Sequence, residues 1–284
     1  MDNFKIIQLA DLHLSPHHDD KDQQTYTLID HMIRYYQPDL IIMTGDQIWS
    51  EGIVHSDETY KRLVEYINQY DVKVATTFGN HDTEGRFSRG DIREIEKGFQ
   101  NYVEKKHSLI VDDKEAYTIE IEMDGELSHV IYIIDGGDYC PHHIGEYSYI
   151  HPQHVNWMRE LRETVYKDVA HHNLMFTHIA LQEYEAIRDV EHEDFRGIFE
   201  DELGYAKLNS GMFTQLLING DVEGVFVGHD HCNDFMIDYH GIKLGYGRIS
   251  GYNAYGDLNR GAREITLRKD KPFETKVLEF DGAL

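Results

Sequence analysis

Cysteine and proline are scarce in this chain of 284 residues, and each scarcity excludes a kind of architecture. The two cysteines, Cys140 and Cys232, are far apart in sequence, so there is neither a disulfide framework nor a cysteine-based zinc site, and we interpret both as ordinary thiols. The five prolines are scattered, and no Pro/Ser-rich linker, internal repeat or composition shift marks a boundary. We therefore expect one domain over residues 1–284.

Long apolar runs and basic residues are also in short supply. No segment approaches the roughly 20 apolar residues that a membrane-spanning helix requires, and the amino-terminal segment does not resemble a secretion signal. We therefore expect a cytoplasmic protein. Acidic residues number 52 against 27 Lys and Arg, for a formal charge of −25, which disfavours extended binding to nucleic acid. The sequence pattern does not indicate a particular oligomeric state.

Short apolar segments alternate with helical patterns along the chain. The apolar segments are rich in Ile and Val and predict strands covered on both faces, at 5–10, 39–44, 72–77, 129–134, 173–177 and 224–227. Helical spacing predicts helices over 22–36, over 56–70, from Pro152 past Leu161, and between Ser210 and Gly220. A hairpin that turns at Asp124-Gly125 and antiparallel strands over 263–268 and 274–280 complete the pattern. Together these elements predict an α/β fold, a layered β-sandwich of mixed sheets flanked by helices.

Five of the predicted strands end directly in residues that can bind metals. These residues are Asp11 and His13, Asp46, Asn80 with its neighbours His81 and Asp82, His178, and finally His229 and His231. Loops converge beyond the carboxyl ends of strands in an α/β sheet, so these side chains can meet in space. Residues two apart in an extended segment point the same way, which would aim both members of each Asp-x-His or His-x-His pair at one point. This oxygen and imidazole set suits Mn, Fe or Zn ions better than Ca²⁺.

The ordered motifs Asp-x-His, Gly-Asp, Gly-Asn-His-Asp, His and Gly-His-Asp-His resemble those of the calcineurin-like metallophosphoesterase superfamily, from Ile6 to beyond His231. The segments IIDGGDY, FTHIALQEY, NSGMF and VFVGHDHCNDF are similar to its purple-acid-phosphatase-related branch of plant and fungal proteins. The resemblance implies two divalent or trivalent metal ions. One ion would be bound by Asp11, His13, Asp46 and His231, and the other by Asp46, Asn80, His178 and His229, with Asp46 as the bridge.

The resemblance also implies roles in catalysis and substrate binding. His81 matches the phosphate-facing histidine of the family, which would protonate the leaving oxygen, and Asp82 would orient its ring. Asn209, Glu183 and Tyr184 lie in the family-like segments and would contact the leaving group.

Trp49 marks a departure from the narrower branch. True purple acid phosphatases have a metal-binding Tyr three residues after the Gly-Asp aspartate, and here that residue is Trp49, whose indole cannot bind a metal. The metal chemistry is therefore expected to be that of the wider superfamily. Two further segments lie near the motifs: His17 and His18 could line the mouth of the site, and the aromatic segment 246–255 could either stack on a substrate or form an ordinary loop.

These assignments predict hydrolysis of a small phosphorylated substrate by a hydroxide that the two metals generate, and a phosphomonoesterase is the preferred reading. The first alternative is a phosphodiesterase with the same core, for example one that acts on a cyclic nucleotide. The second is a non-catalytic scaffold on the same fold. Scaffold members of the superfamily typically lack the phosphate-facing histidine or several ligands, whereas this chain has the complete set.

Overall fold

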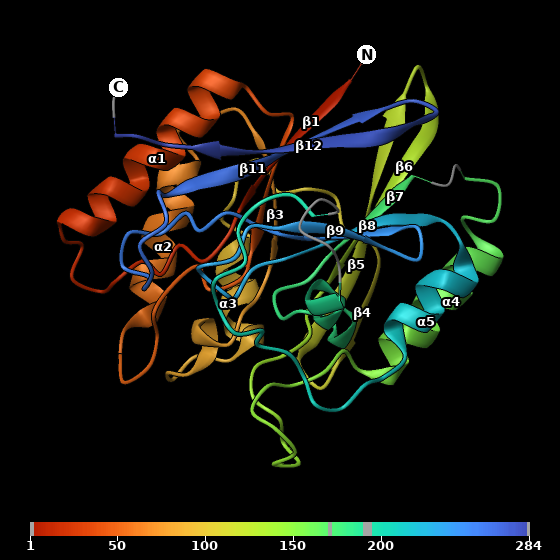
Figure 1. The fold of residues 1–284 in the computed structure, drawn as a ribbon. Helices are drawn as coiled ribbons and strands as arrows, with labels where there is room; N and C mark the ends of the chain where they lie inside the picture. Colours follow the sequence, from red (N-terminus) through yellow and green to blue (C-terminus); the bar gives the residue numbers. More distant parts are fainter. Residues whose placement is uncertain (1–2, 170–171, 190–194, 283–284) are drawn as a thin grey trace.

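Two mixed β-sheets form the centre of the computed structural model, which describes residues 3–169, 172–189 and 195–282 (Figure 1). The five-stranded sheet has the order β12-β11-β1-β2-β3 and comprises β1 (Phe4–Leu9), β2 (Leu40–Thr44), β3 (Lys73–Thr77), β11 (Gly261–Arg268) and β12 (Lys271–Glu279). The seven-stranded sheet has the order β4-β5-β6-β7-β8-β10-β9 and comprises β4 (Lys106–Val111), β5 (Lys114–Met123), β6 (Glu126–Ile134), β7 (Asn173–Phe176), β8 (Val222–Val227), β9 (Met236–Tyr239) and β10 (Ile242–Tyr246).

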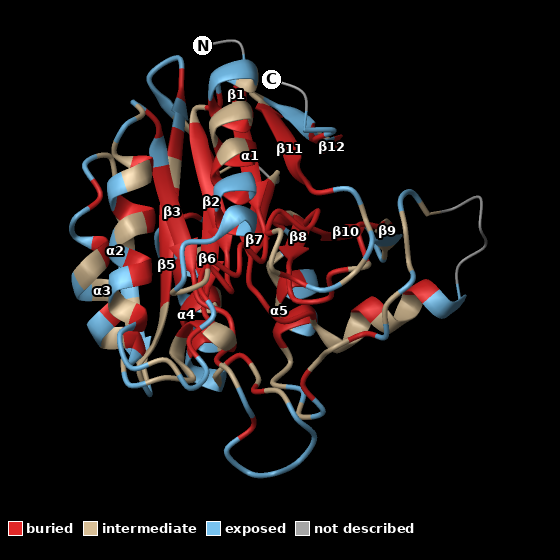
Figure 2. Cartoon of the chain, turned by 90° about the vertical axis from the view of Figure 1, so that its left-hand side faces the viewer, coloured by how far each residue is buried: buried red, intermediate tan, exposed pale blue. Residues whose placement is uncertain are grey.

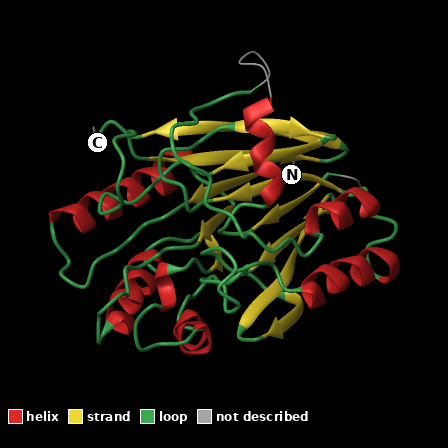
Figure 3. Cartoon of the chain, turned by 60° about the horizontal axis from the view of Figure 1, so that its bottom comes forward, coloured by secondary structure: helices red, strands yellow, loops and turns green. Residues whose placement is uncertain are grey.

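Helices cover the outer face of each sheet, and Figure 3 shows them on both sides of the strands. The helices on the five-stranded sheet are α1 (Asp20–Tyr36), α2 (Ser56–Ile67) and α3 (Arg89–Glu96). Those on the seven-stranded sheet are α4 (Pro152–Thr164), α5 (Met212–Asn219) and the 3-10 helix η2 (Gln182–Asp189). A third apolar cluster lies between the two sheets. The predicted layered α/β sandwich is therefore confirmed. Among the described helices, none has the length and apolar character needed to cross a bilayer.

The burial of the parallel strands explains why the predicted segments are nearly all apolar. In β2, Ile41 and Met43 pack with the helices, whereas Leu40 and Ile42 face the other sheet. Successive side chains of a strand point to opposite faces, so a strand covered on both faces needs apolar residues at every position. Figure 2 shows these strands as almost continuously buried.

The six predicted apolar strands and the hairpin are present. Asp124 and Gly125 turn the hairpin with φ of 56° and 79°, the left-handed conformation that a tight two-residue turn requires. Six elements were not predicted: α3, β4, β9, β10 and the 3-10 helices η1 (His81–Thr83) and η2. Strand β4 is a half-exposed edge strand, and β9 with β10 forms a short hairpin, so their apolar patterns are weak.

Helix α3 does begin with a sequence signal for a helix start. Ser88 accepts a hydrogen bond from the Asp91 backbone N–H, and the Asp91 carboxylate accepts one from the Ser88 N–H, which is a capping box. The helix was missed because Gly90 stands in its first turn and only eight residues follow the cap.

Loops at the carboxyl ends of the central strands are joined to one another by backbone hydrogen bonds. The N–H of His13 donates to Asp46 O at 2.9 Å, and the N–H of Gly228 donates to His178 O at 3.0 Å. The parallel strands β1, β2 and β3 end at one edge, as do β7 and β8 of the other sheet. This edge holds the polar clusters of the sequence.

Candidate metal centre

Two groups of buried side chains lie close together at this edge. The first contains Asp11, His13 and His231, and the second contains Asp46, His178 and His229. Asp46 stands between the groups, since its Oδ2 is 3.6 Å from His13 Nε2 and 3.3 Å from His178 Nε2. A carboxylate in this position can bridge two cations.

The side chains of the centre leave polar atoms free to bind metal ions. Asp46 Oδ2 is buried and accepts no hydrogen bond, and a buried carboxylate oxygen without a hydrogen bond is costly. His13 Nε2 and His231 Nε2 face each other at 3.2 Å. Asp11 Oδ1 lies 3.6 Å from His231 Nε2. Oxygen and imidazole donors that converge in this way fit cations of the Mn, Fe or Zn class.

His178 and Asn80 are oriented toward the same point. The Nδ1–H of His178 donates to the carbonyl of Thr44 at 2.8 Å, which leaves Nε2 directed at Asn80 Oδ1, 3.2 Å away. A backbone carbonyl on the outer nitrogen is the usual way in which a metal-binding imidazole is held. Asn80 therefore joins the second group, as the family pattern implied.

The carboxylates and burial act in opposite directions on the histidines of the centre. Burial favours the neutral form of His178, but the carboxylates of Asp46 and Asp11 outweigh burial and raise its pKa to about 10. Burial likewise works against the charged form of Asp46, yet His178 and His13 hold the pKa of Asp46 well below its usual range. Burial lowers the pKa of both His13 and His229 to about 3, so these imidazoles are neutral and offer lone pairs.

The ligand-bearing backbone is not extended, and this part of the sequence interpretation is wrong. Asp11, His13, Asp46 and His229 have φ of 56°, 43°, 51° and 79°. Left-handed conformations of non-glycine residues cost on the order of 1–3 kcal/mol each and gather at functional sites. The side chains of Asp11 and His13 converge because the chain turns sharply at both residues, not because two-residue spacing in a strand aligns them. His229 and His231 belong to different groups.

Gly45 and Gly79 are required by close approach. A Cβ on Gly79 would lie 2.1 Å from Asp46 Oδ1, and a Cβ on Gly45 would lie 2.3 Å from His178 Nδ1. Gly45 also has a φ of 94°, which other residues rarely adopt. The Gly-Asp and Gly-Asn motifs therefore leave the space that the neighbouring ligands fill.

Asp82 does not orient His81, contrary to the sequence prediction. Its buried carboxylate instead accepts hydrogen bonds from three backbone N–H groups, those of Asp46 at 2.9 Å, Gly79 at 2.8 Å and Ile48 at 3.1 Å. Residues His81–Thr83 form a single 3-10 turn, η1, in which neighbouring side chains diverge. Asp82 thus fixes the two loops that hold Asp46 and Asn80.

A cavity of about 360 Å³ opens above the ligands. It is lined by His13, Asp46, Trp49, His81, Tyr147, His229, Asp230, His231, Asn253, Ala254 and Tyr255. Aromatic rings form its rim: Trp49 stacks on His81 with ring centres 4.4 Å apart, and Tyr255 lies 4.0 Å from His231. Tyr255 belongs to the aromatic segment 246–255, which was expected either to stack on a substrate or to form an ordinary loop.

The three predicted substrate residues lie elsewhere. Tyr184 is fully buried, and its hydroxyl donates to Val225 O at 2.8 Å, so it is a core residue. Glu183 and Asn209 contact each other at 3.1 Å and line a separate cavity of about 30 Å³. These three assignments are therefore wrong, because the parts of the family-like segments that carry these residues lie away from the cavity.

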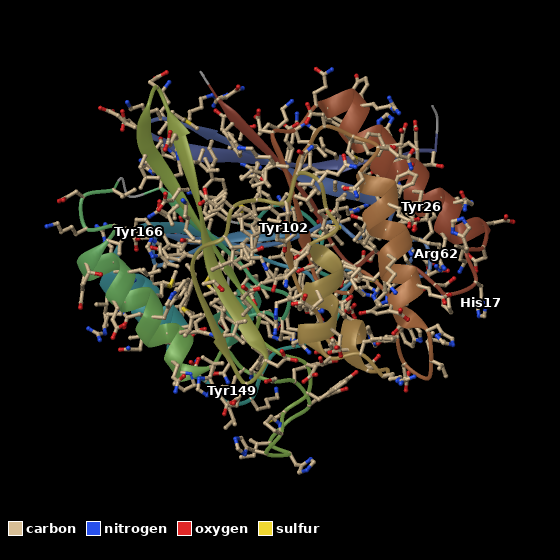
Figure 4. All side chains as sticks on the ribbon, turned by 180° about the vertical axis from the view of Figure 1, so that it is seen from behind. His17, Tyr26, Arg62, Tyr102, Tyr149 and Tyr166 are labelled. Carbon is tan, nitrogen blue, oxygen red and sulfur yellow. The ribbon has the colours of Figure 1, made fainter. Side chains whose placement is uncertain are left out.

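His17 and His18 are exposed and do not line the cavity either. Figure 4 shows His17 at the outer edge of the molecule, near Arg62. The guanidinium of Arg62 donates to Ser15 O at 3.2 Å, and this contact holds the segment away from the site. The two cysteines are free thiols, as expected.

Sequence reasoning missed Tyr147 and Glu84. Tyr147 packs edge-on against His229, with ring centres 4.3 Å apart, but it comes from the loop after β6, which has no metal-ligand motif. Glu84 lies 2.6 Å from His81 Nδ1 and could have been found as an acidic residue three positions after that histidine.

Comparison with known proteins agrees with this geometry. Probable inactive purple acid phosphatase 29 of Arabidopsis thaliana is 28% identical over 304 residues, which cover 94% of this chain and 77% of that protein. Phosphatase DCR2 of Saccharomyces cerevisiae is 28% identical over 82% of this chain and 45% of its own length.

Solved structures share the fold. A dimetal phosphatase from Danio rerio superposes with a TM-score of 0.61 at 15% identity and covers 97% of this chain and 99% of its own. GAP50, the anchor in the inner membrane complex of Plasmodium, gives 0.62 at 15% identity over all of this chain and 87% of its own. The model of the calcineurin-like phosphoesterases matches residues 4–233. The chain therefore belongs to the calcineurin-like phosphoesterase family, hydrolases that act on phosphate esters.

Proposed function

We propose that this chain hydrolyses monoesters of phosphate on small molecules and binds two cations to do so. One cation is assigned to Asp11, His13, Asp46 and His231, and the other to Asp46, Asn80, His178 and His229. The observation that carries the proposal is the position of Asp46 Oδ2, buried without a hydrogen bond and within 3.6 Å of ligand nitrogens from both groups. The oxygen and imidazole ligands suit Mn, Fe or Zn ions.

The side chains around the centre have separate roles in the proposed reaction. Two cations held by these two groups of side chains would clamp the phosphate and supply a hydroxide nucleophile near neutral pH. His81 lies beside His13, with ring centres 5.2 Å apart, and lines the cavity. From there it can donate a proton to the leaving oxygen, while Asp82 keeps the two ligand loops in register.

The wall of the cavity favours a small substrate with a single phosphate. None of its described lining residues is Lys or Arg, so only the cations would neutralise the charge of a phosphate. Trp49 and Tyr255 offer aromatic surface to the organic part of the substrate. A second phosphate would face an acidic protein without a basic partner in the cavity.

A non-catalytic role is the second candidate, because the relatives include proteins named inactive phosphatases and an anchor. The chain itself argues against that role. All seven proposed ligands and His81 are present, and they lie together in two adjoining groups beside one cavity.

A substrate panel tests the proposal. The protein reconstituted with Mn²⁺ or Zn²⁺ is expected to hydrolyse aryl and alkyl phosphomonoesters faster than the matching phosphodiesters, cyclic nucleotides included. Comparison of kcat/KM across the panel measures the preference. Faster turnover of diesters would assign the site to a phosphodiesterase, and no turnover of any ester with both metals bound would favour the scaffold.

A further inference from the structure

Glu84 makes the contact with the His81 ring that the family resemblance assigned to Asp82. Its Oε2 lies 2.6 Å from His81 Nδ1, and the two side chains are only 11% and 22% exposed. A carboxylate can only accept, so the His81 Nδ1–H donates and the opposite nitrogen, Nε2, is left for the cavity. The bond forms within the turn η1, because residues three apart in a 3-10 helix lie above one another.

The second oxygen of Glu84 is also engaged. The hydroxyl of Tyr139, from the loop after β6, donates to Glu84 Oε1. The same hydroxyl accepts a hydrogen bond from Asn80 Nδ2 at 3.4 Å. The Asn80 amide is thereby turned so that its Oδ1 faces His178 Nε2. One chain of contacts thus joins a proposed ligand, Asn80, to the proposed proton donor, His81.

The loop that presents Tyr139 is itself held by a buried guanidinium. Arg89 donates to Asp135 Oδ2 at 2.7 Å and to Asp138 Oδ2 at 3.1 Å on one side. On the other side it donates to Gly79 O at 3.0 Å, next to Asn80. Arg89 is 5% exposed, so its guanidinium makes these charge-assisted hydrogen bonds while shielded from water. The bonds fix the loop after β6 relative to the segment that carries Asn80.

We propose that Glu84 is a positioning residue for the reaction, which holds the His81 imidazole toward the substrate, and that Tyr139 couples this orientation to Asn80. The proposal rests on the proposed function of the site. An exposed His–Glu pair of this spacing would contribute little. Here both oxygens of Glu84 are taken by groups of the centre, and Asp82, the expected partner, is fully occupied by backbone N–H groups.

The test compares Glu84→Gln and Tyr139→Phe with two control variants, Glu51→Gln and Tyr35→Phe, at exposed positions. Glu84→Gln is expected to lower turnover of alkyl phosphates by about 10–100-fold, by analogy with the effect of altering the outer partner of a metal-binding imidazole. The loss on nitrophenyl phosphate should be smaller, since that leaving group needs little protonation. Both cations should stay bound, and Tyr139→Phe should give a weaker effect in the same direction.

Two readouts separate positioning from a merely structural role. In the His81→Ala background, Glu84→Gln should cause no further loss, because both act through one ring. In the metal-free protein, the ¹⁵N shift of His81 Nδ1 should change in Glu84→Gln but not in Glu51→Gln. Additive losses or an unchanged shift would overturn the proposal. The shift needs no turnover, so failure of the proposed function, seen as an inactive wild-type protein, is distinguishable from failure of this inference.

Discussion

Replacing Asp46 with Asn is expected to abolish most activity, by more than about 100-fold, and to lower the occupancy of both cations together. The reason is the position of its Oδ2 between the two ligand groups, 3.6 Å from His13 Nε2 and 3.3 Å from His178 Nε2. Changing an outer partner of a metal ligand costs 10–100-fold, and loss of the shared carboxylate should exceed that range. Turnover on an aryl phosphate and metal content per chain measure the two effects.

The control for this variant is Asp20→Asn, at an exposed position in the first turn of α1. It removes the same charge without touching the centre. His231→Ala provides a second comparison, since it should weaken the first cation more than the second. Retention of two tightly bound ions by Asp46→Asn would show that Asp46 is not the bridge.

His81→Ala is expected to lower turnover of alkyl phosphates by about 10²–10⁴-fold, the contribution typical of general acid catalysis. The loss should shrink on nitrophenyl phosphate, whose leaving oxygen needs little protonation. Metal content should be unchanged, because the contact between His81 and Asp46 is made by the backbone. The His81 N–H donates to Asp46 Oδ1 at 2.8 Å, and alanine keeps this bond.

His55→Ala is the matched control, because His55 is exposed and its side chain makes no capping bond to α2. Turnover on both substrates, metal content and Tm should be measured for each variant. Equal turnover of wild type and His81→Ala on both substrates would contradict the proton-donor assignment. Loss of metal along with activity would make His81 part of the metal site instead.

The sequence predicted the fold well where burial imposes a pattern on every position. Strands such as β2 are covered on both faces, so nearly every residue is apolar and the sequence pattern reveals the strand. Strand β4, whose side chains are half exposed, left no such pattern. The proximity of the seven proposed ligands could be predicted because each follows a buried strand in a short motif, and the structure brings these side chains together.

The surroundings of the ligands could not be predicted in the same way. Tyr147 and Tyr139 reach the centre from a loop whose course depends on Arg89 and its two carboxylate partners, which no local pattern reveals. The family resemblance implied that Asp82 orients the His81 ring. The 3-10 turn instead directs the Asp82 carboxylate to backbone N–H groups, and Glu84 contacts the His81 ring. Single-domain organisation and a cytoplasmic location stay predictions.

The central claim is that two cations in this centre are needed for ester hydrolysis, and metal titration tests it most directly. Metal-free protein should be inactive on an aryl phosphate, bind two Mn²⁺ or Zn²⁺ ions per chain by calorimetry, and regain turnover in step with occupancy. In the same titration, Asp46→Asn should neither bind two ions tightly nor regain turnover. Full activity in strong chelator, with metal analysis confirming an empty centre, would contradict the account.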